Sequence, residues 1–213
     1  MNHTQKHKLN VIIRAVVHIG CLSPLAVLIV QFFSNHLTAN PIQAAEQRTG
    51  DVALILLLIT LSITPLVVFS GFTLMTRHRR TFGLYTFMYA SIHLLLFVGL
   101  DYGFDPGLIW PIVAQKPFII VGLAAFVGLL LLASTSFHWW MRRLGKAWKA
   151  LHRLVYLIGF LVVIHFAWAL KGDIFHLSGD VQRPLIAGAV LIVLLLVRLP
   201  FVRRRIVQVR MNF

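Results

Sequence analysis

The sequence predicts an all-α integral membrane protein, a six-transmembrane-helix bundle with both termini cytoplasmic. Three observations support this prediction. Of the 213 residues, 59% are hydrophobic and only 12% are charged, a balance that excludes an ordinary soluble domain. The apolar residues gather into six runs, each long enough to cross a bilayer core of ~30 Å. The basic residues concentrate in every second segment between those runs.

The six runs form one domain that occupies the whole chain, 1–213. Their approximate bounds are 11–33, 52–74, 83–100, 117–137, 150–170 and 184–201. The first run follows Lys6, Lys8 and Arg14, a charged flank typical of a signal peptide. Its length of ~20 residues exceeds that of a usual signal-peptide core, so we expect it to stay as a spanning helix. Pro24 and Pro65 predict kinks in the first two helices.

Charge is distributed unequally between the two sides of the bundle. With both termini inside, the inner segments hold sixteen basic residues and no acid, namely Lys6, Lys8, Arg14, Arg77, Arg79, Arg80, Arg142, Arg143, Lys146, Lys149, Arg153, Arg198, Arg203, Arg204, Arg205 and Arg210. The outer side holds the remaining charges, which are Arg48, Lys116, Lys171, Arg183, Glu46, Asp51, Asp101, Asp105, Asp173 and Asp180. Because positive loops stay cytoplasmic, this asymmetry predicts the topology.

The net charge of +14 is also typical of proteins that bind nucleic acid. Here, however, the bases lie in short segments beside apolar spans, where they would face lipid headgroups. We therefore expect the lipid bilayer as a partner and no nucleic acid.

The first run carries His18 and Cys21, the single cysteine of the chain. A lone histidine in such a run is more often a structural hydrogen-bonding residue than a ligand. One cysteine excludes an intramolecular disulfide, and no CxxCH attachment sequence is present. Any haem would therefore be b-type, held without a covalent bond.

The loop 76–80, TRHRR, leads into the third run. Membrane anchoring by positive charge explains most of this sequence. A more specific hypothesis is that Arg79 or Arg80, at a helix start on the inner surface, binds an anionic group. A haem propionate, a flavin phosphate or an anionic lipid headgroup would each suit a guanidinium.

Two histidines lie deep in the third and fifth runs. His93 comes 13 residues after Arg80, and His165 comes 12 residues after Arg153. Both helices leave the cytoplasm, so these imidazoles should lie at nearly the same depth. A buried imidazole costs free energy unless something binds it. Two neighbouring helices can thus offer the axial pair for one haem iron, although two separate histidines bonded to backbone or water would fit the same pattern.

His152 lies in the same predicted helix as His165, which we expect over 146–170. Thirteen residues separate the two rings by ~20 Å along the axis, leaving His152 near the inner surface. A second haem there would need His18, His78 or His138, a non-protein ligand, or sharing between subunits. The alternatives are a quinone or flavin with His152 as a hydrogen-bond or proton partner, or a structural histidine.

Gly159 lies midway between these two histidines. A glycine there would allow close approach of a flat macrocycle or, equally, of a neighbouring helix.

The other runs offer less chemistry. The fourth has no ionisable residue between Lys116 and His138 and is expected to be scaffold, and the sixth is expected to end at Pro200. No GxGxxG motif is present, and about a dozen residues follow the sixth run, so we expect no nucleotide-binding dehydrogenase domain. Electrons would have to arrive from a quinol, a bound flavin or a separate reductase.

Several segments carry a family resemblance. RRTFGLYTFMYASIHL, LGKAWKALHRLVYL and IHFAWALK, with VHIGCLSP and ITPL before them, resemble the MsrQ (YedZ) family of bacterial inner-membrane haem proteins, and the resemblance covers essentially the whole chain. The family belongs to the ferric reductase-like transmembrane group, whose distant members include NADPH oxidases and STEAP reductases. Those relatives commonly hold haem between their third and fifth helices. NADPH oxidases place two histidines on each, whereas the third helix here offers one.

The resemblance implies a role as well as a fold. It implies the membrane subunit of a periplasmic methionine sulfoxide reductase system, located in the bacterial inner membrane. Electrons would pass from the quinone pool, or from a cytoplasmic flavin reductase, to a molybdopterin-containing catalytic subunit, MsrP, that repairs oxidised proteins. The implied cofactors are haem b, one or two per chain, and FMN, although the sequence contains no flavin motif.

We therefore expect His93 and His165 to ligate a b-type haem toward the periplasmic side. His152 is a third candidate ligand, and Arg79 and Arg80 are candidates for cofactor binding. We assign no catalytic residue, because the outer loops are short and lack a cysteine, so sulfoxide reduction should occur on a partner. The rival hypothesis is a proton-coupled or metal-ion transporter using the same histidines. Such carriers often use a carboxylate buried between the ends of a helix, and the sequence predicts none.

Overall fold

The computed structural model describes residues 3–170 and 180–211, and the regular elements in these ranges are all helical. Lys171 and Asp173, which the charge analysis assigns to the outer side, lie outside the described residues. The helices are α1 (His3–Phe33), α2 (Pro41–Ser70), the 3-10 helix η1 (Leu74–His78), α3 (Arg79–Leu95), the π-helix η2 (Leu96–Asp101), α4 (Pro106–Gln115), α5 (Pro117–Ser134), α6 (His138–Leu144), α7 (Lys146–Leu151), α8 (Leu154–Ala169), α9 (Gln182–Leu196) and α10 (Pro200–Met211).

The expected bundle of membrane-spanning helices is confirmed. Five helical stretches within the described residues are long and apolar enough to cross a membrane, namely Lys8–Phe33, Pro41–Ser70, Leu74–Asp101, Pro117–Ser134 and Lys146–Ala169. The sixth is a bent pair, Gln182–Leu196 with Pro200–Arg210, whose parts meet at 75°. α9 alone has 15 residues, so the sixth span is shorter than the sequence predicts.

Helix α2 begins at Pro41, eleven residues before the predicted start of the second span. The Asn40 side chain caps it by accepting a hydrogen bond from the Gln43 N–H at 3.1 Å, and proline occupies the first helical position. Most of the segment between the first two predicted runs, 34–51, is thus helical. This part of α2 is polar, so the search for apolar runs did not predict it as part of a spanning helix.

The single helix predicted over 146–170 is interrupted. α7 ends at Leu151, the chain turns through His152 and Arg153, and α8 starts at Leu154. The third span is also irregular, because it passes into the π-helical η2 soon after His93. Both irregularities fall beside candidate ligands, His152 and His93. π-Helical turns often occur near functional sites.

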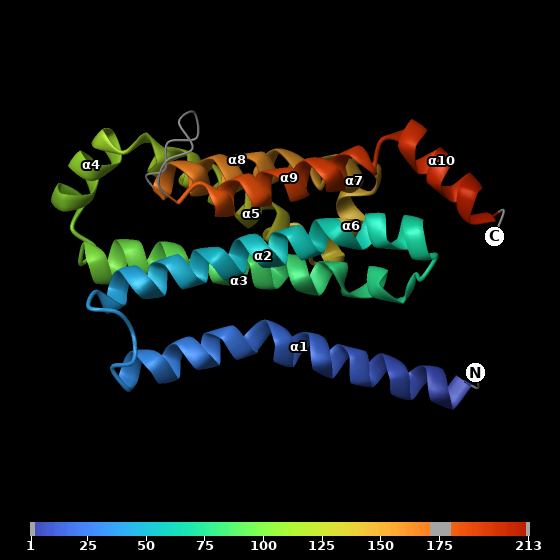
Figure 1. Ribbon diagram of the computed structural model, residues 1–213, viewed down its shortest axis with the longest axis horizontal. Coiled ribbons are helices and arrows are strands. Elements are labelled where there is room, and N and C mark those ends of the chain that lie inside the picture. The colour runs from blue at the N-terminus through green and yellow to red at the C-terminus, as the bar shows by residue number, and fades with distance from the viewer. Residues whose placement is uncertain (1–2, 171–179, 212–213) are drawn as a thin grey trace.

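The helices pack in neighbouring pairs, α2 with α3 and α5 with α8, while α9 covers α8 and α1 lies along the outside of the first pair (Figure 1). Both chain termini lie at one end, together with α6, α7 and the turn between α2 and α3 (Figure 1). α4 and the link from α1 to α2 lie at the opposite end (Figure 1). The main core joins α2, α5, α8 and α9 through Leu57, Leu61, Leu129, Ile158 and Leu191.

Tyr89 connects α3 to α1 beside Pro24. α1 is bent along its length (Figure 1). Pro24 cannot donate to the Gly20 carbonyl, which instead accepts from the Ser23 hydroxyl at 3.2 Å. One residue on, the Tyr89 hydroxyl donates to the Cys21 carbonyl at 2.7 Å and accepts from the Leu25 N–H at 3.1 Å. A side chain inserted between these two groups is a recognised cause of a helix kink.

A second proline creates a similar requirement in α2. Pro65 has no N–H for the carbonyl of Leu61, a residue with 0% exposure. Arg198, in the bend between α9 and α10, donates from Nη2 to that carbonyl at 2.6 Å and from Nη1 to the Tyr156 hydroxyl at 2.7 Å. The arginine thus satisfies an oxygen that the proline leaves unpaired.

We expect Arg198→Met to destabilise the protein by about 1–3 kcal/mol, the usual cost of leaving a buried acceptor unsatisfied. In a Pro65→Ala background the loss should be smaller, because the substituted alanine restores the helical N–H donor to the Leu61 carbonyl. Thermal unfolding of the purified protein in detergent measures both. The exposed Arg203→Met variant on α10 is the matched control. Equal losses from Arg198→Met in both backgrounds would contradict this role.

Candidate functional site

The imidazoles of His93 and His165 lie next to each other between α3 and α8. Their ring centres are 6.2 Å apart, and the rings are nearly perpendicular, at 79°. The sequence predicted that these two side chains would meet at one depth, and the structure places them side by side although they are 72 residues apart in the chain. Both residues are partly buried.

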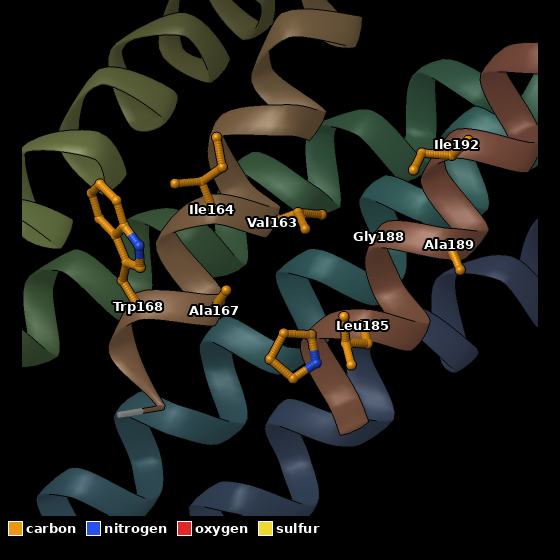
Figure 2. A pocket seen from close by; sticks show the side chains of 9 residues that line it. Val163, Ile164, Ala167, Trp168, Leu185, Gly188, Ala189 and Ile192 are labelled. Atoms are coloured by element: carbon orange, nitrogen blue, oxygen red, sulfur yellow. The ribbon is translucent and has the colours of Figure 1, made fainter. Parts of the chain in front are cut away.

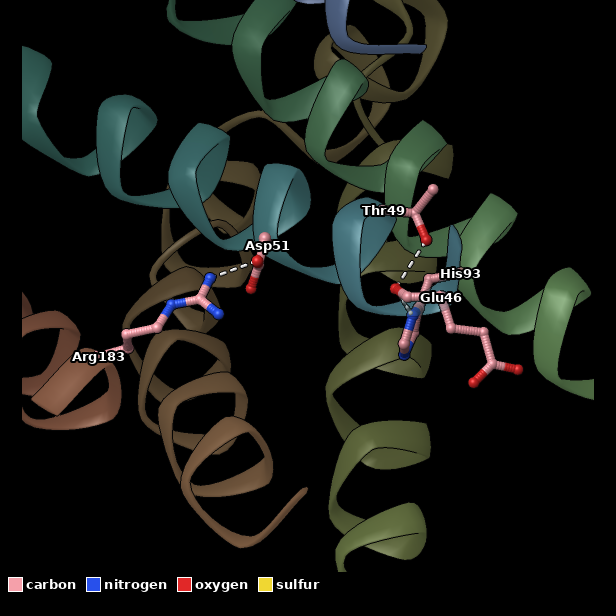
Figure 3. Close-up of polar contacts among 5 residues, drawn as sticks. All are labelled: Glu46, Thr49, Asp51, His93 and Arg183. Atoms are coloured by element: carbon pink, nitrogen blue, oxygen red, sulfur yellow. Dashed lines mark hydrogen bonds and ion pairs between the residues drawn. The ribbon is translucent and has the colours of Figure 1, made fainter. Parts of the chain in front are cut away.

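Each imidazole is oriented by one backbone carbonyl. His93 Nδ1 lies 2.9 Å from the Glu46 oxygen on α2, and His165 Nδ1 lies 2.8 Å from the Phe118 oxygen on α5. Figure 3 shows His93 reaching Glu46, whose carbonyl also accepts from the Thr49 hydroxyl. A carbonyl oxygen can only accept, so both Nδ1 atoms carry the proton. In the neutral ring, Nε2 then keeps its lone pair and can bind a metal.

A glycine makes room for each ring. Gly50 and Gly122 lie four residues after the two accepting carbonyls, so they sit one helical turn further along α2 and α5. A Cβ added at Gly122 would lie 2.6 Å from His165 Nδ1, and one at Gly50 would lie 3.3 Å from His93 Nδ1. Each histidine also follows its acceptor by 47 residues. The same arrangement is thus used twice.

Sequence reasoning missed both of these glycines and selected Gly159 instead. A Cβ at Gly159 would meet Leu191 at 3.1 Å and Leu61 at 3.6 Å. Gly159 therefore serves the packing of α8 against α9 and α2, which was one of its two proposed roles. The shared spacing of carbonyl, glycine and histidine was the signal that could have identified the others.

The donor set fits a b-type haem iron with two axial imidazoles. A bond between a metal and an imidazole nitrogen is about 2 Å long, and that nitrogen lies about 1 Å from the centre of its ring. Two imidazoles that bind one ion from opposite directions would therefore have ring centres about 6 Å apart. The observed 6.2 Å matches this separation. Since Nδ1 is engaged on both rings, Nε2 is the nitrogen that each can offer.

The N-terminal end of α2 carries further polar groups around this site. Asp51 pairs with Arg183 at the start of α9 (Figure 3). The Arg183 guanidinium also lies 5.6 Å from the centre of the Phe166 ring, next to His165 in the chain. Glu46 has one carboxylate oxygen that is buried without a hydrogen-bond partner. Because α2 starts earlier than predicted, Glu46 lies inside a helix, near its start, as a partly buried residue.

His152 lies in a separate environment at the end of the bundle that holds the termini. Its ring stacks on Trp148, with centres 4.0 Å apart, and its Nδ1 lies 3.1 Å from the Trp148 carbonyl. Its Nε2 lies 3.5 Å from the Ser136 hydroxyl, at the limit of a hydrogen bond. The Leu132 backbone is a further hydrogen-bonding partner of this ring.

The histidines considered as partners of His152 have other contacts. His18 Nδ1 lies 2.7 Å from the Tyr85 hydroxyl, and His138 Nδ1 lies 3.5 Å from a guanidinium nitrogen. His78 is buried and lines a cavity with His18. Within the described part of the chain, none of the three contacts His152, and no cluster of three or more ligand-type side chains could hold a metal ion.

Arg79 and Arg80 do not share a site. Arg80 is the residue whose Nη1 approaches His138, and it lines the cavity beside α1. Arg79 lies within electrostatic range of His152 and Arg198 instead. Consecutive helical residues point about 100° apart, which explains the separation.

A second cavity, of about 410 Å³, lies between α8 and α9 (Figure 2). Val163, Ile164, Trp168, Leu185 and Ile192 supply most of its apolar lining. Its lining offers no carboxylate, imidazole or amine, so it carries no acid–base or metal chemistry.

Comparisons with known proteins show which family the chain belongs to. The family described as ferric reductase like transmembrane component matches residues 49–164, which include His93 and end directly before His165. The chain is 42% identical over 183 residues to the protein-methionine-sulfoxide reductase heme-binding subunit MsrQ of Bordetella pertussis, covering 86% of each chain. It is 43% identical over 194 residues to the MsrQ of Rhodospirillum rubrum, covering 90% of each. With the MsrQ of Xanthomonas campestris pv. campestris it shares 45% over 167 residues, or 76% of this chain and 77% of the relative.

These identities extend over most of each chain, and the helices long enough to span a membrane agree with a multi-pass protein of a bacterial inner membrane. The protein belongs to the MsrQ family, within the ferric reductase-like transmembrane group.

Proposed function

We propose that this protein is the haem-binding electron-transfer subunit of a methionine sulfoxide reductase system, with His93 and His165 as the axial ligands of a b-type haem. One observation supports the ligand assignment best. The two ring centres lie 6.2 Å apart, and each ring donates a hydrogen bond from Nδ1 to a backbone carbonyl. The family and the names of its relatives favour this role over the transporter hypothesis.

The haem supplies one-electron redox chemistry, and the protein supplies the surroundings. The Glu46 and Phe118 carbonyls hold both imidazoles in one tautomer, and such hydrogen bonds also make a ligand nitrogen more basic. Gly50 and Gly122 let the rings lie against α2 and α5. Apolar residues on α3 and α8, among them Ala90 and Leu161, pack against the main core and would limit the access of water to a bound haem.

The basic segments support an orientation with both termini in the cytoplasm. His152 then lies toward the cytoplasm, and the pair of His93 and His165 lies toward the periplasm. An electron moving outward would follow the usual membrane potential, which contributes ~2.3 kcal/mol per 100 mV for a full crossing.

Electrons would enter near His152 and Arg79. His152 Nε2 would exchange its present contacts, with Ser136 and the Leu132 backbone, for a second iron or a quinone oxygen. Arg79 nearby would suit a haem propionate or the phosphate of FMN. The donor would be the quinone pool or a cytoplasmic flavin reductase, as the family resemblance implies.

The sulfoxide would be reduced on a catalytic partner, which we propose to be a periplasmic, molybdopterin-containing, MsrP-like subunit. Cys21, the one cysteine of the chain, is buried in the interior between α1 and its neighbours and cannot reach a protein substrate. α4 and the link between α1 and α2 form the end of the molecule that would face this partner (Figure 1).

We expect His93→Ala and His165→Ala each to abolish the haem held by this pair, because one axial ligand is lost in each variant. His152→Ala should retain at least part of the haem signal. Reduced-minus-oxidised absorbance spectra, with haem quantified per polypeptide, measure this and also give the number of haems. Retention of the full spectrum in both of the first two variants would refute the assignment.

Gly122→Ala tests the positioning of His165 without removing a ligand. The new methyl group would lie 2.6 Å from Nδ1 and 2.7 Å from Cε1, so the ring must move from the Phe118 carbonyl. We expect lower haem content, or a shifted midpoint potential in the haem that remains.

Gly20→Ala is the matched control, because nothing lies within 4 Å of the added methyl group in α1. Unchanged haem content and potential in Gly122→Ala would show that the ring position does not matter.

A further inference from the structure

An ion pair joins α2 to α9 close to the two proposed haem ligands. The Arg183 guanidinium, at the start of α9, donates to the Asp51 carboxylate on α2 (Figure 3). The two residues are 132 positions apart in the chain. Neither is a proposed ligand, so the effect of their charges on a haem is a separate question from what holds the iron.

Asp51 brings a negative charge to the His93 side of the site. It follows Gly50, where an added Cβ would lie 3.3 Å from His93 Nδ1. Asp51 also lies within electrostatic range of His93. Its side chain is only 25% exposed, so water screens this charge only in part.

Arg183 brings a positive charge to the His165 side. Its guanidinium lies 5.6 Å from the centre of the Phe166 ring, and Phe166 directly follows His165 in α8. The arginine side chain is 51% exposed. Exposed ion pairs contribute little to folding stability, because water and salt screen them. A stabilising role therefore accounts poorly for a pair at this position.

A charge close to a haem changes the midpoint potential of its iron. Reduction adds an electron, so a nearby negative charge opposes it and a nearby positive charge favours it. The opposite charges of an ion pair largely cancel when both lie at similar distances from the iron. Removing one partner would leave the other charge uncompensated.

On the basis of the proposed function, in which His93 and His165 hold a haem, we propose that the Asp51–Arg183 pair sets the midpoint potential of that haem. Each charge compensates the other, so the iron experiences little net field from the two together. Asp51 and Arg183 are then residues that tune the potential from outside the ligand set.

Three variants test this role, namely Asp51→Asn, Arg183→Gln and the two changes together. We expect Asp51→Asn to raise the midpoint potential, because Arg183 remains as an uncompensated positive charge. Arg183→Gln should lower it, because Asp51 remains as an uncompensated negative charge. The double variant should return close to the wild-type potential. Spectroelectrochemical titration of the purified, haem-loaded protein measures all three.

Matched controls remove the same charges elsewhere at this end of the molecule. Arg48→Gln removes an exposed guanidinium on α2 that bonds Gln31 of α1. Asp105→Asn removes a carboxylate from the exposed cap of α4, and asparagine caps a helix equally well. Both controls should keep the wild-type potential.

Ionic strength provides a second check on the two single variants. Raising it from ~0.01 M to ~1 M shortens the range of exposed charges about tenfold. The opposite shifts of Asp51→Asn and Arg183→Gln should therefore shrink as salt is added.

Shifts of the same sign in the two single variants would overturn the proposal, because the pair would then act by holding the helices in place. Wild-type potentials in both, or equal shifts in the matched controls, would overturn it as well. So would loss of haem from Arg183→Gln, since the arginine would then be needed to retain the group.

The ligand assignment can fail separately. It is tested by the haem spectra of the His93 and His165 variants, whereas the Asp51 and Arg183 variants should keep the wild-type haem content and unfolding temperature. A full haem spectrum with an unshifted potential would count against the ion pair alone.

Discussion

The hydrogen bond from a buried imidazole N–H to a backbone carbonyl is the interaction on which the candidate haem site depends. In an apolar bundle an unpaired N–H is costly, so each ring must find an acceptor close by. His93 donates to the Glu46 carbonyl, and His165 donates to the Phe118 carbonyl. α2 and α5 carry no proposed ligand, yet without their carbonyls and glycines the rings on α3 and α8 would have no defined position.

The same need to satisfy backbone groups explains how the helices are joined. Lipid removes most of the hydrophobic drive for helices to associate, so packing and polar contacts between helices gain importance. Near Pro24 in α1 and Pro65 in α2, a side chain from another part of the bundle bonds to the helix backbone. Tyr89 bridges the opened turn of α1, and Arg198 reaches the Leu61 carbonyl in α2. The breaks in the helices are therefore also points where they are held together.

Much of this arrangement could be predicted from the sequence, because it depends on depth. Apolar runs and basic flanks set the level of each residue in the membrane, and this level alone predicted that His93 and His165 would meet. Features that depend on direction around a helix were missed. The carbonyls of Glu46 and Phe118, the role of Gly122 and the divergence of Arg79 from Arg80 all require knowing which face meets which neighbour. The early start of α2 was missed because polar residues can be helical too.

The repeated spacing of carbonyl, glycine and histidine makes the two proposed ligands chemically equivalent. Each would be a neutral imidazole of the same tautomer, supported by the same kind of acceptor. A haem that both imidazoles held would serve as an electron carrier, changing its oxidation state without binding dioxygen or a sulfoxide.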